Sequence, residues 1–104
     1  MSDTLTVRGW SGCPTTSGVE AWVQRVCADA GVPAPALTFE WVETDAEAVE
    51  LAFPGSPTFV REGVDLFLDP AATPSLTCRL YRTRDGRPSP LPDPEDFIAA
   101  LRSS

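Results

Sequence analysis

Strand patterns and helix patterns alternate along this chain, and this alternation restricts the fold more than any other feature. Alternating apolar residues, bounded by turn residues, predict strands at residues 4–10, 37–42, 58–60 and 76–83. Apolar residues at three- and four-residue spacing predict helices at residues 15–30, 46–53 and 94–101. The stretch 64–75, with a proline-containing loop at its end, predicts an excursion that folds back on the domain. The predicted order is β-α-β-α-β-β-α, which indicates an α/β fold.

Polar residues at the starts of the predicted helices indicate where each one begins. Thr15, Thr16 and Ser17 offer hydroxyls that can accept from the first amides of the first helix. Asp45 and Asp93 are the predicted caps of the second and third helices.

Length and charge indicate one small domain over residues 1–104 and exclude some partners. The net charge of -7 repels phosphate backbones and anionic lipid surfaces, so we expect no nucleic acid and no membrane as partner. No apolar run approaches the roughly 18 residues that a membrane span needs. We therefore expect a cytoplasmic protein, while its oligomeric state does not follow from these features.

Histidine and lysine are both absent from the sequence. Their absence excludes a lysine Schiff base, a histidine general base and every catalytic triad that contains histidine. The chain has three cysteines and no Cys-x-x-Cys pair, which fits neither a disulfide framework nor a zinc knuckle. We expect free thiols in a reducing compartment, no metal site and no cofactor. The acidic residues within 40–50 match no calcium loop and are interpreted as a solvated face.

Two short motifs carry a resemblance to a known family. Residues 10–16, WSGCPTT, lie between the first strand and the first helix and resemble the Cys-Pro-x-Cys or Cys-Pro-x-Ser segment of glutaredoxins. Residues 55–58, GSPT, open the third strand and resemble the thioredoxin-family loop whose proline is cis. The order of elements and the two motifs resemble the thioredoxin-like superfamily. Residues 12–14, 53–60 and 78–81 together resemble a group of its short actinobacterial members. The resemblance implies a bacterial protein with a central mixed four-stranded sheet flanked by helices.

Cys13 is the candidate nucleophile of this site. A cysteine at the start of a helix lies near free amides and the positive end of the helix dipole, which lower the pKa of a thiol. Thr15 and Thr16 can donate hydrogen bonds to its thiolate. Thr16 also stands where the resemblance implies a resolving cysteine, so the motif is monothiol. The alternative is that Cys13 is a small buried residue that only packs at a helix start.

The remaining candidate residues lie on both sides of Cys13. The resemblance implies that a cis peptide at Pro57 presents the backbone of Ser56 to an extended thiol substrate. Trp10 beside the Cys13 loop can line a substrate groove, and Pro14 belongs to the same surface. The predicted substrate-binding residues are Trp10, Pro14, Thr15 and Ser56, with Pro57 grouped with the catalytic residues.

The two other cysteines have different predicted roles. Cys27 follows Cys13 by fourteen positions, and a continuous helix would separate them by about 20 Å, so Cys27 is predicted to pack in the core. Cys78 follows a loop whose path the sequence leaves open. A buried structural thiol is the leading interpretation, and a redox or soft-metal partner of Cys13 is the alternative.

These residues predict a monothiol thioredoxin-like protein that uses Cys13 in thiol-disulfide exchange or reversible S-thiolation. Its partner would be a small thiol or the disulfide of a client protein. The alternative is a non-catalytic binding module of the same fold that holds a protein partner or a thiophilic metal.

Overall fold

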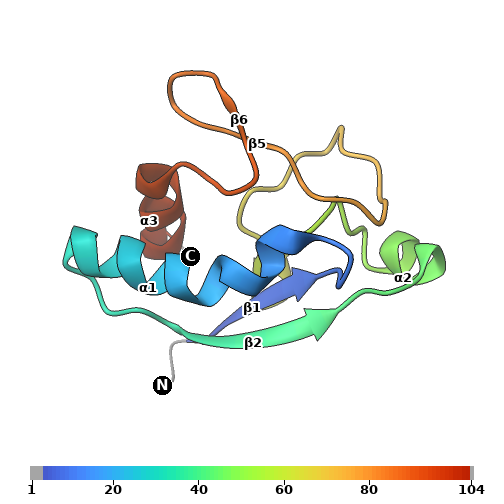
Figure 1. Ribbon diagram of the computed structural model, residues 1–104, viewed down its shortest axis with the longest axis horizontal. Helices are drawn as coiled ribbons and strands as arrows, with labels where there is room; N and C mark the ends of the chain where they lie inside the picture. Colours follow the sequence, from blue (N-terminus) through green and yellow to red (C-terminus); the bar gives the residue numbers. More distant parts are fainter. Residues whose placement is uncertain (1–3, 104) are drawn as a thin grey trace.

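Strand β1 (Thr4–Gly9) lies inside a four-stranded mixed sheet in this computed structural model, which describes residues 4–103 (Figure 1). The strand order is β2-β1-β3-β4. The other strands are β2 (Ala36–Trp41), β3 (Thr58–Arg61) and β4 (Val64–Asp65). β1 runs parallel to β2 and antiparallel to β3, and β3 runs antiparallel to β4. The predicted mixed α/β fold with a four-stranded sheet is therefore confirmed.

Two helices pack together on one face of this sheet. Helix α1 (Val19–Ala30) follows a short 3₁₀ helix, η1 (Pro14–Gly18), and crosses the sheet in front of β1 and β2, with α3 (Pro94–Ser103) beside it (Figure 1). Helix α2 (Asp45–Glu50) lies apart from them, near the end of β2. The loop between β1 and α1 is therefore held at both ends by packed elements.

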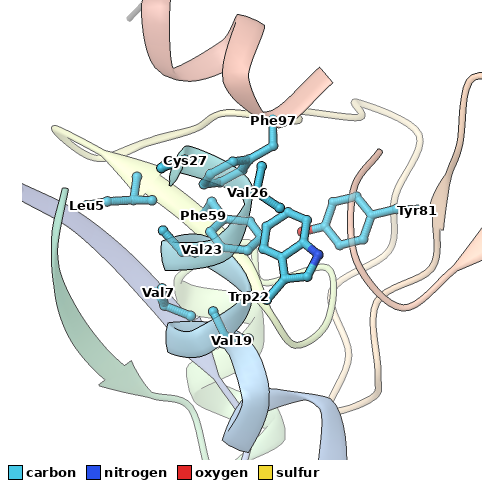
Figure 2. Packing of buried hydrophobic residues seen from close by; sticks show 10 residues of the cluster. All are labelled: Leu5, Val7, Val19, Trp22, Val23, Val26, Cys27, Phe59, Tyr81 and Phe97. Atoms are coloured by element: carbon cyan, nitrogen blue, oxygen red, sulfur yellow. The ribbon is translucent and has the colours of Figure 1, made fainter. Parts of the chain in front are cut away.

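An aromatic cluster connects α1, α3 and the sheet. The ring centroid of Trp22 lies 4.9 Å from that of Phe97 and 6.1 Å from that of Phe59 (Figure 2). The buried cluster consists of Leu5, Val7, Val19, Trp22, Val23, Val26, Cys27, Phe59, Tyr81 and Phe97. Cys27 is fully buried in it, which confirms the prediction that this residue packs in the core. Because such cores are closely packed, they fix the position of the loop that precedes α1.

The start of the first helix differs from the prediction. α1 begins at Val19 after Gly18, and neither it nor η1 has a side-chain cap, so the hydroxyl caps predicted at 15–17 are wrong. Pro14 suits the first position of a helical turn, since its amide is absent and its φ is fixed. The hydroxyl of Ser17 donates back to the Pro14 carbonyl at 3.0 Å instead of accepting from an amide. Cys13 therefore precedes a five-residue 3₁₀ turn and not an α-helix.

The cap of α2 differs from the prediction, and the cap of α3 agrees with it. Thr44, not Asp45, caps α2: its hydroxyl accepts from the Glu47 amide at 3.1 Å, and the Glu47 carboxylate accepts from the Glu43 amide at 3.2 Å. The Thr-x-x-Glu sequence is that of a capping box, but here the Glu47 carboxylate reaches the amide of Glu43, one residue before the cap, and not that of Thr44. Asp93 caps α3 as predicted, since its carboxylate accepts from the Glu95 amide at 2.9 Å.

The predicted strand at 76–83 is wrong as part of the main sheet. The fourth strand of that sheet is β4. Within 76–83, Cys78 forms only an isolated bridge with Ser56, and the end of the segment pairs as β5 (Tyr81–Arg82) with β6 (Pro88–Ser89) in a separate ribbon. The ribbon lies away from the sheet (Figure 1). Arg79 and Tyr81 are buried, whereas the side chain of Leu80 is 66% exposed. An alternating pattern defines the two faces of a strand but not which of them is buried. In this segment the buried face carries the ion-paired Arg79.

Within residues 4–103, no helix is long and apolar enough to cross a membrane.

Candidate functional site

Cys13 and Cys78 form a disulfide between residues 65 positions apart, with their Cα atoms 5.5 Å from each other. The expectation of free thiols is therefore wrong for this pair. Cys78 is exposed and bonded to Cys13, so the leading interpretation of a buried structural thiol is wrong. Cys13 itself is 2% exposed. The sequence could not pair them because the course of 64–75 decides where Cys78 lies.

The loop that carries Cys13 is held by contacts on both sides. The Cys13 amide donates to the Trp10 carbonyl at 3.0 Å, which closes a turn. A Cβ atom at Gly12 would collide with the Trp10 ring, so the turn needs glycine there. The amide and hydroxyl of Ser11 both donate to the Glu43 carboxylate, at 3.1 Å and 2.7 Å. Trp10 is half-buried in this arrangement and packs on its own loop.

Glu43 is thus a site residue that the sequence analysis placed on a solvated face. Its carboxylate anchors the Cys13 loop from the chain beyond β2. Nothing in the local spacing signals a hydrogen bond across 32 positions. The residues on the Cys13 side that were predicted to bind substrate differ in exposure: Pro14 is exposed and Thr15 is half-buried.

The Ser56-Pro57 peptide bond is cis, as predicted. The Pro57 carbonyl accepts from the buried Tyr81 hydroxyl at 2.5 Å, and the Thr58 hydroxyl donates to the Gly55 carbonyl at 2.6 Å. Burial raises the pKa of Tyr81 well above its ordinary value, so the phenol stays protonated and keeps donating. These bonds fix the loop that opens β3.

The segment around Cys78 pairs with the backbone of Ser56. The Ser56 amide donates to the Thr77 carbonyl at 2.8 Å, and the Ser56 carbonyl accepts from the Arg79 amide at 2.8 Å. The two segments form a parallel bridge in which Ser56 is opposite Cys78. Gly55 makes this approach possible, because its φ is +134° and a Cβ there would lie 2.8 Å from the Arg79 backbone. Cys78 is therefore placed beside Ser56 by main-chain bonds on both of its sides.

Thr16 contacts Ser56 and not the sulfur of Cys13. Its hydroxyl lies 2.5 Å from the Ser56 hydroxyl, and both residues are buried. The Cys13 Sγ lies 3.5 Å from the Ser56 carbonyl oxygen. The predicted hydrogen bonds from Thr15 and Thr16 to a Cys13 thiolate stay predictions, because the Cys13 sulfur is in a disulfide, and the Thr16 hydroxyl pairs with that of Ser56.

Arg79 is the second site residue that sequence analysis missed. Its buried guanidinium donates to the Asp65 carboxylate at 2.9 Å and to the Phe67 carbonyl at 2.5 Å, and its Cζ lies 4.7 Å from the centre of the Tyr81 ring. A buried arginine needs this density of partners, since its charge is not titrated away. The only available signal was an arginine between two apolar residues, with an aspartate fourteen positions earlier.

A separate hollow lies between α1 and α3. It has a volume of about 630 Å³ and is lined by Trp22, Val26 and Ile98, with neither Cys13 nor Cys78 among its lining residues. Among residues 4–103, no group of three or more cysteine or acidic side chains lies together as metal ligands would. The chemistry that the described site offers is the two-electron opening and closing of one disulfide.

No family model, curated protein or solved structure matches this chain. The function has to be inferred from the Cys13–Cys78 site itself.

Proposed function

We propose that this chain is a thioredoxin-like protein that uses Cys13 in thiol-disulfide exchange, with Cys78 as its second thiol. The observation that carries the proposal is the Cys13–Cys78 disulfide, which lies beside the cis Ser56-Pro57 bond. Cys13 and the cis bond lie in the two motifs that carry the resemblance to the family, whereas Cys78 lies outside them. The partner is a small thiol or the disulfide of a client protein.

The arrangement of elements supports the thioredoxin-like assignment. The chain contains β1, α1, β2, α2, β3 and β4 in this order, with α3 last, and its sheet is mixed. Cys13 follows β1 and the cis proline directly precedes β3, as the resemblance implies. β1 and β3 are neighbours in the sheet, which brings the two motifs together.

A second thiol changes the expected mechanism from a monothiol to a dithiol cycle. In a monothiol protein a mixed disulfide waits for an outside thiol, whereas a Cys78 thiol beside Cys13 can release it internally. The protein dithiol loses two electrons and two protons as the Cys13–Cys78 bond forms, and a partner disulfide gains them as two thiols. A cytoplasmic location suits this cycle, because low-molecular-weight thiols there reduce the bond again.

The test is reduction of a small disulfide, 2-hydroxyethyl disulfide, with a supplied dithiol reductant. Wild type and Cys27→Ser should both show turnover, since Cys27 lies in the core and is outside the disulfide. The double variant Cys13→Ser with Cys78→Ser, which lacks both thiols of the disulfide, should lose this turnover. Absence of turnover in wild type, with the reductant shown to open the disulfide, would refute the exchange function.

The burial of Cys13 favours a second candidate, a non-catalytic binding module. A sulfur that is 2% exposed is poorly placed to meet an outside partner, and the disulfide would then be structural. In this case the reduced pair offers two thiolates for a thiophilic ion or a protein partner. The module predicts a disulfide that strengthens the fold without any turnover.

A further inference from the structure

The two sulfur-bearing residues of the disulfide differ in their access to solvent. Cys13 is buried against Ser56, which has no exposed surface, and Thr16, which is 4% exposed. Cys78 is exposed, and so are its neighbours Thr77 and Leu80. An outside sulfur compound therefore approaches this bond from the side of Cys78. In thiol-disulfide exchange, the cysteine sulfur and a sulfur of the outside compound must come into direct contact. The difference in solvent exposure between Cys13 and Cys78 therefore decides which of the two reacts first.

The backbone of Ser56 offers nothing to an outside peptide. Its amide and its carbonyl are both bonded to the chain itself, at Thr77 and Arg79. An extended client peptide would have to displace these backbone hydrogen bonds. One of them comes from the amide of Arg79, whose guanidinium pairs with Asp65. A small disulfide needs no backbone pairing and can reach Cys78 alone.

We infer that Cys78, and not Cys13, is the thiol that exchanges with the outside, that its substrates are low-molecular-weight disulfides, and that Cys13 is the internal resolving thiol. This inference rests on the proposed exchange function and reverses the roles that the Cys-Pro-x-Thr motif predicts. Arg79 and Ser56 act as positioning residues, because they hold Cys78 beside Cys13 through main-chain bonds that do not involve the disulfide.

The steps balance with a symmetric small disulfide, RSSR, as oxidant. The Cys78 thiolate attacks one sulfur of RSSR, forms a Cys78–SR mixed disulfide and releases RS⁻. The Cys13 thiol, whose sulfur faces the Ser56 carbonyl, then attacks Cys78 Sγ, gives its proton to the released thiolate and displaces the second RS⁻. The second RS⁻ takes from solvent the proton that the Cys78 thiol lost when it ionised. The protein dithiol is thereby oxidised by two electrons, and RSSR is reduced to two thiols.

The test uses oxidised glutathione with reduced Cys13→Ser and Cys78→Ser proteins, with the mixed disulfide followed by intact mass. Each variant keeps one of the two thiols. We expect Cys13→Ser to form the adduct at least about tenfold faster than Cys78→Ser, because only its remaining thiol is exposed. Peptide mapping should place the adduct on Cys78. The same order should appear in reduced wild type under brief iodoacetamide treatment, which tests the assignment without a substitution.

The outcomes separate the two proposals. A faster adduct on Cys13, or its earlier alkylation in wild type, would overturn the assignment of Cys78 while leaving exchange intact. A reduced wild type that oxidised glutathione does not convert to the Cys13–Cys78 disulfide would refute the exchange function as well. Faster oxidation by a cysteine-containing peptide disulfide than by oxidised glutathione would refute the small-disulfide substrate class alone.

Discussion

Arg79 connects the position of Cys78 to the interior of the protein. Its amide bonds the Ser56 carbonyl, and its guanidinium pairs with Asp65, so the residue beside Cys78 is fixed at both ends. Replacing Arg79→Met leaves a partly buried carboxylate without its cation, which typically costs about 3 to 5 kcal/mol. We expect this loss in urea unfolding, together with slower closure of the Cys13–Cys78 bond after the first exchange at Cys78.

The matched control for this prediction is Arg82→Met. Arg82 is exposed, three positions further along, and its guanidinium bonds only the Gly86 carbonyl among the contacts identified within residues 4–103. It should change stability by less than about 0.5 kcal/mol. Equal closure rates in wild type and Arg79→Met would show that Arg79 supports the fold without positioning Cys78.

The buried hydroxyl pair of Thr16 and Ser56 gives a second prediction at this scale. Thr16→Val removes one hydroxyl and leaves the Ser56 hydroxyl, which has no exposed surface, without its partner at 2.5 Å. The expected cost is about 1 to 3 kcal/mol in free energy of unfolding, whereas Thr16→Ser keeps the bond. In a double-mutant cycle, Ser56→Ala should recover part of the loss caused by Thr16→Val. Additive effects would show that the two hydroxyls do not interact.

At the scale of single elements, helix α3 gives a prediction that depends on pH. The Asp93 carboxylate accepts hydrogen bonds from the Arg84 and Glu95 amides, at 3.0 Å and 2.9 Å. These bonds lower the pKa of Asp93 below its ordinary value, and the bond from the Arg84 amide contributes most. A lowered folded-state pKa means that the ionised cap stabilises the protein above the unfolded-state pKa. This contribution is lost as pH falls through the lowered value.

The measurement is the Tm of wild type and Asp93→Ala across acidic pH. The difference in Tm should be constant near neutral pH and shrink as the pH falls below the ordinary aspartate range. Asp93→Asn keeps a cap oxygen without the charge, so it separates capping from ionisation. Glu95 and Asp96 also pair with Arg84, and all the variants retain both residues. A difference that grows toward acid pH would contradict the cap.

Sequence patterns predicted best the elements that bury one strongly apolar face, because that face is visible in the spacing of neighbouring residues. Leu5 and Val7 alternate in β1, and Val19, Val23 and Val26 repeat along α1, because each element buries one apolar face. The pattern at 76–83 failed for a different reason. Its inner face is set by the ion pair of Arg79 with Asp65, which depends on the path of the intervening chain and not on local spacing.

At the scale of the whole molecule, the site was predicted in part. The two motifs placed Cys13 and the cis Pro57 together, because β1 and β3 are neighbours in the sheet. The pairing of Cys78 could not be derived, since it depends on where the loop after β4 returns. Glu43 was missed because a carboxylate that anchors a distant loop has the same local sequence context as one that faces solvent.

The disulfide also joins distant parts of the chain, which makes global stability depend on redox state. Closing a loop of 65 residues restricts the unfolded chain and, by loop-closure entropy, stabilises the fold by about 4 kcal/mol. Urea unfolding with and without a strong reductant should show a lower midpoint for the reduced protein and a steeper slope, because its unfolded chain is less compact and exposes more surface. The double variant Cys13→Ser with Cys78→Ser should unfold near the midpoint of the reduced wild type. The reductant should not change its midpoint, although the buried Cys27 is retained. An unchanged wild-type midpoint, after loss of the disulfide has been verified by mass, would contradict a stabilising role for the Cys13–Cys78 bond.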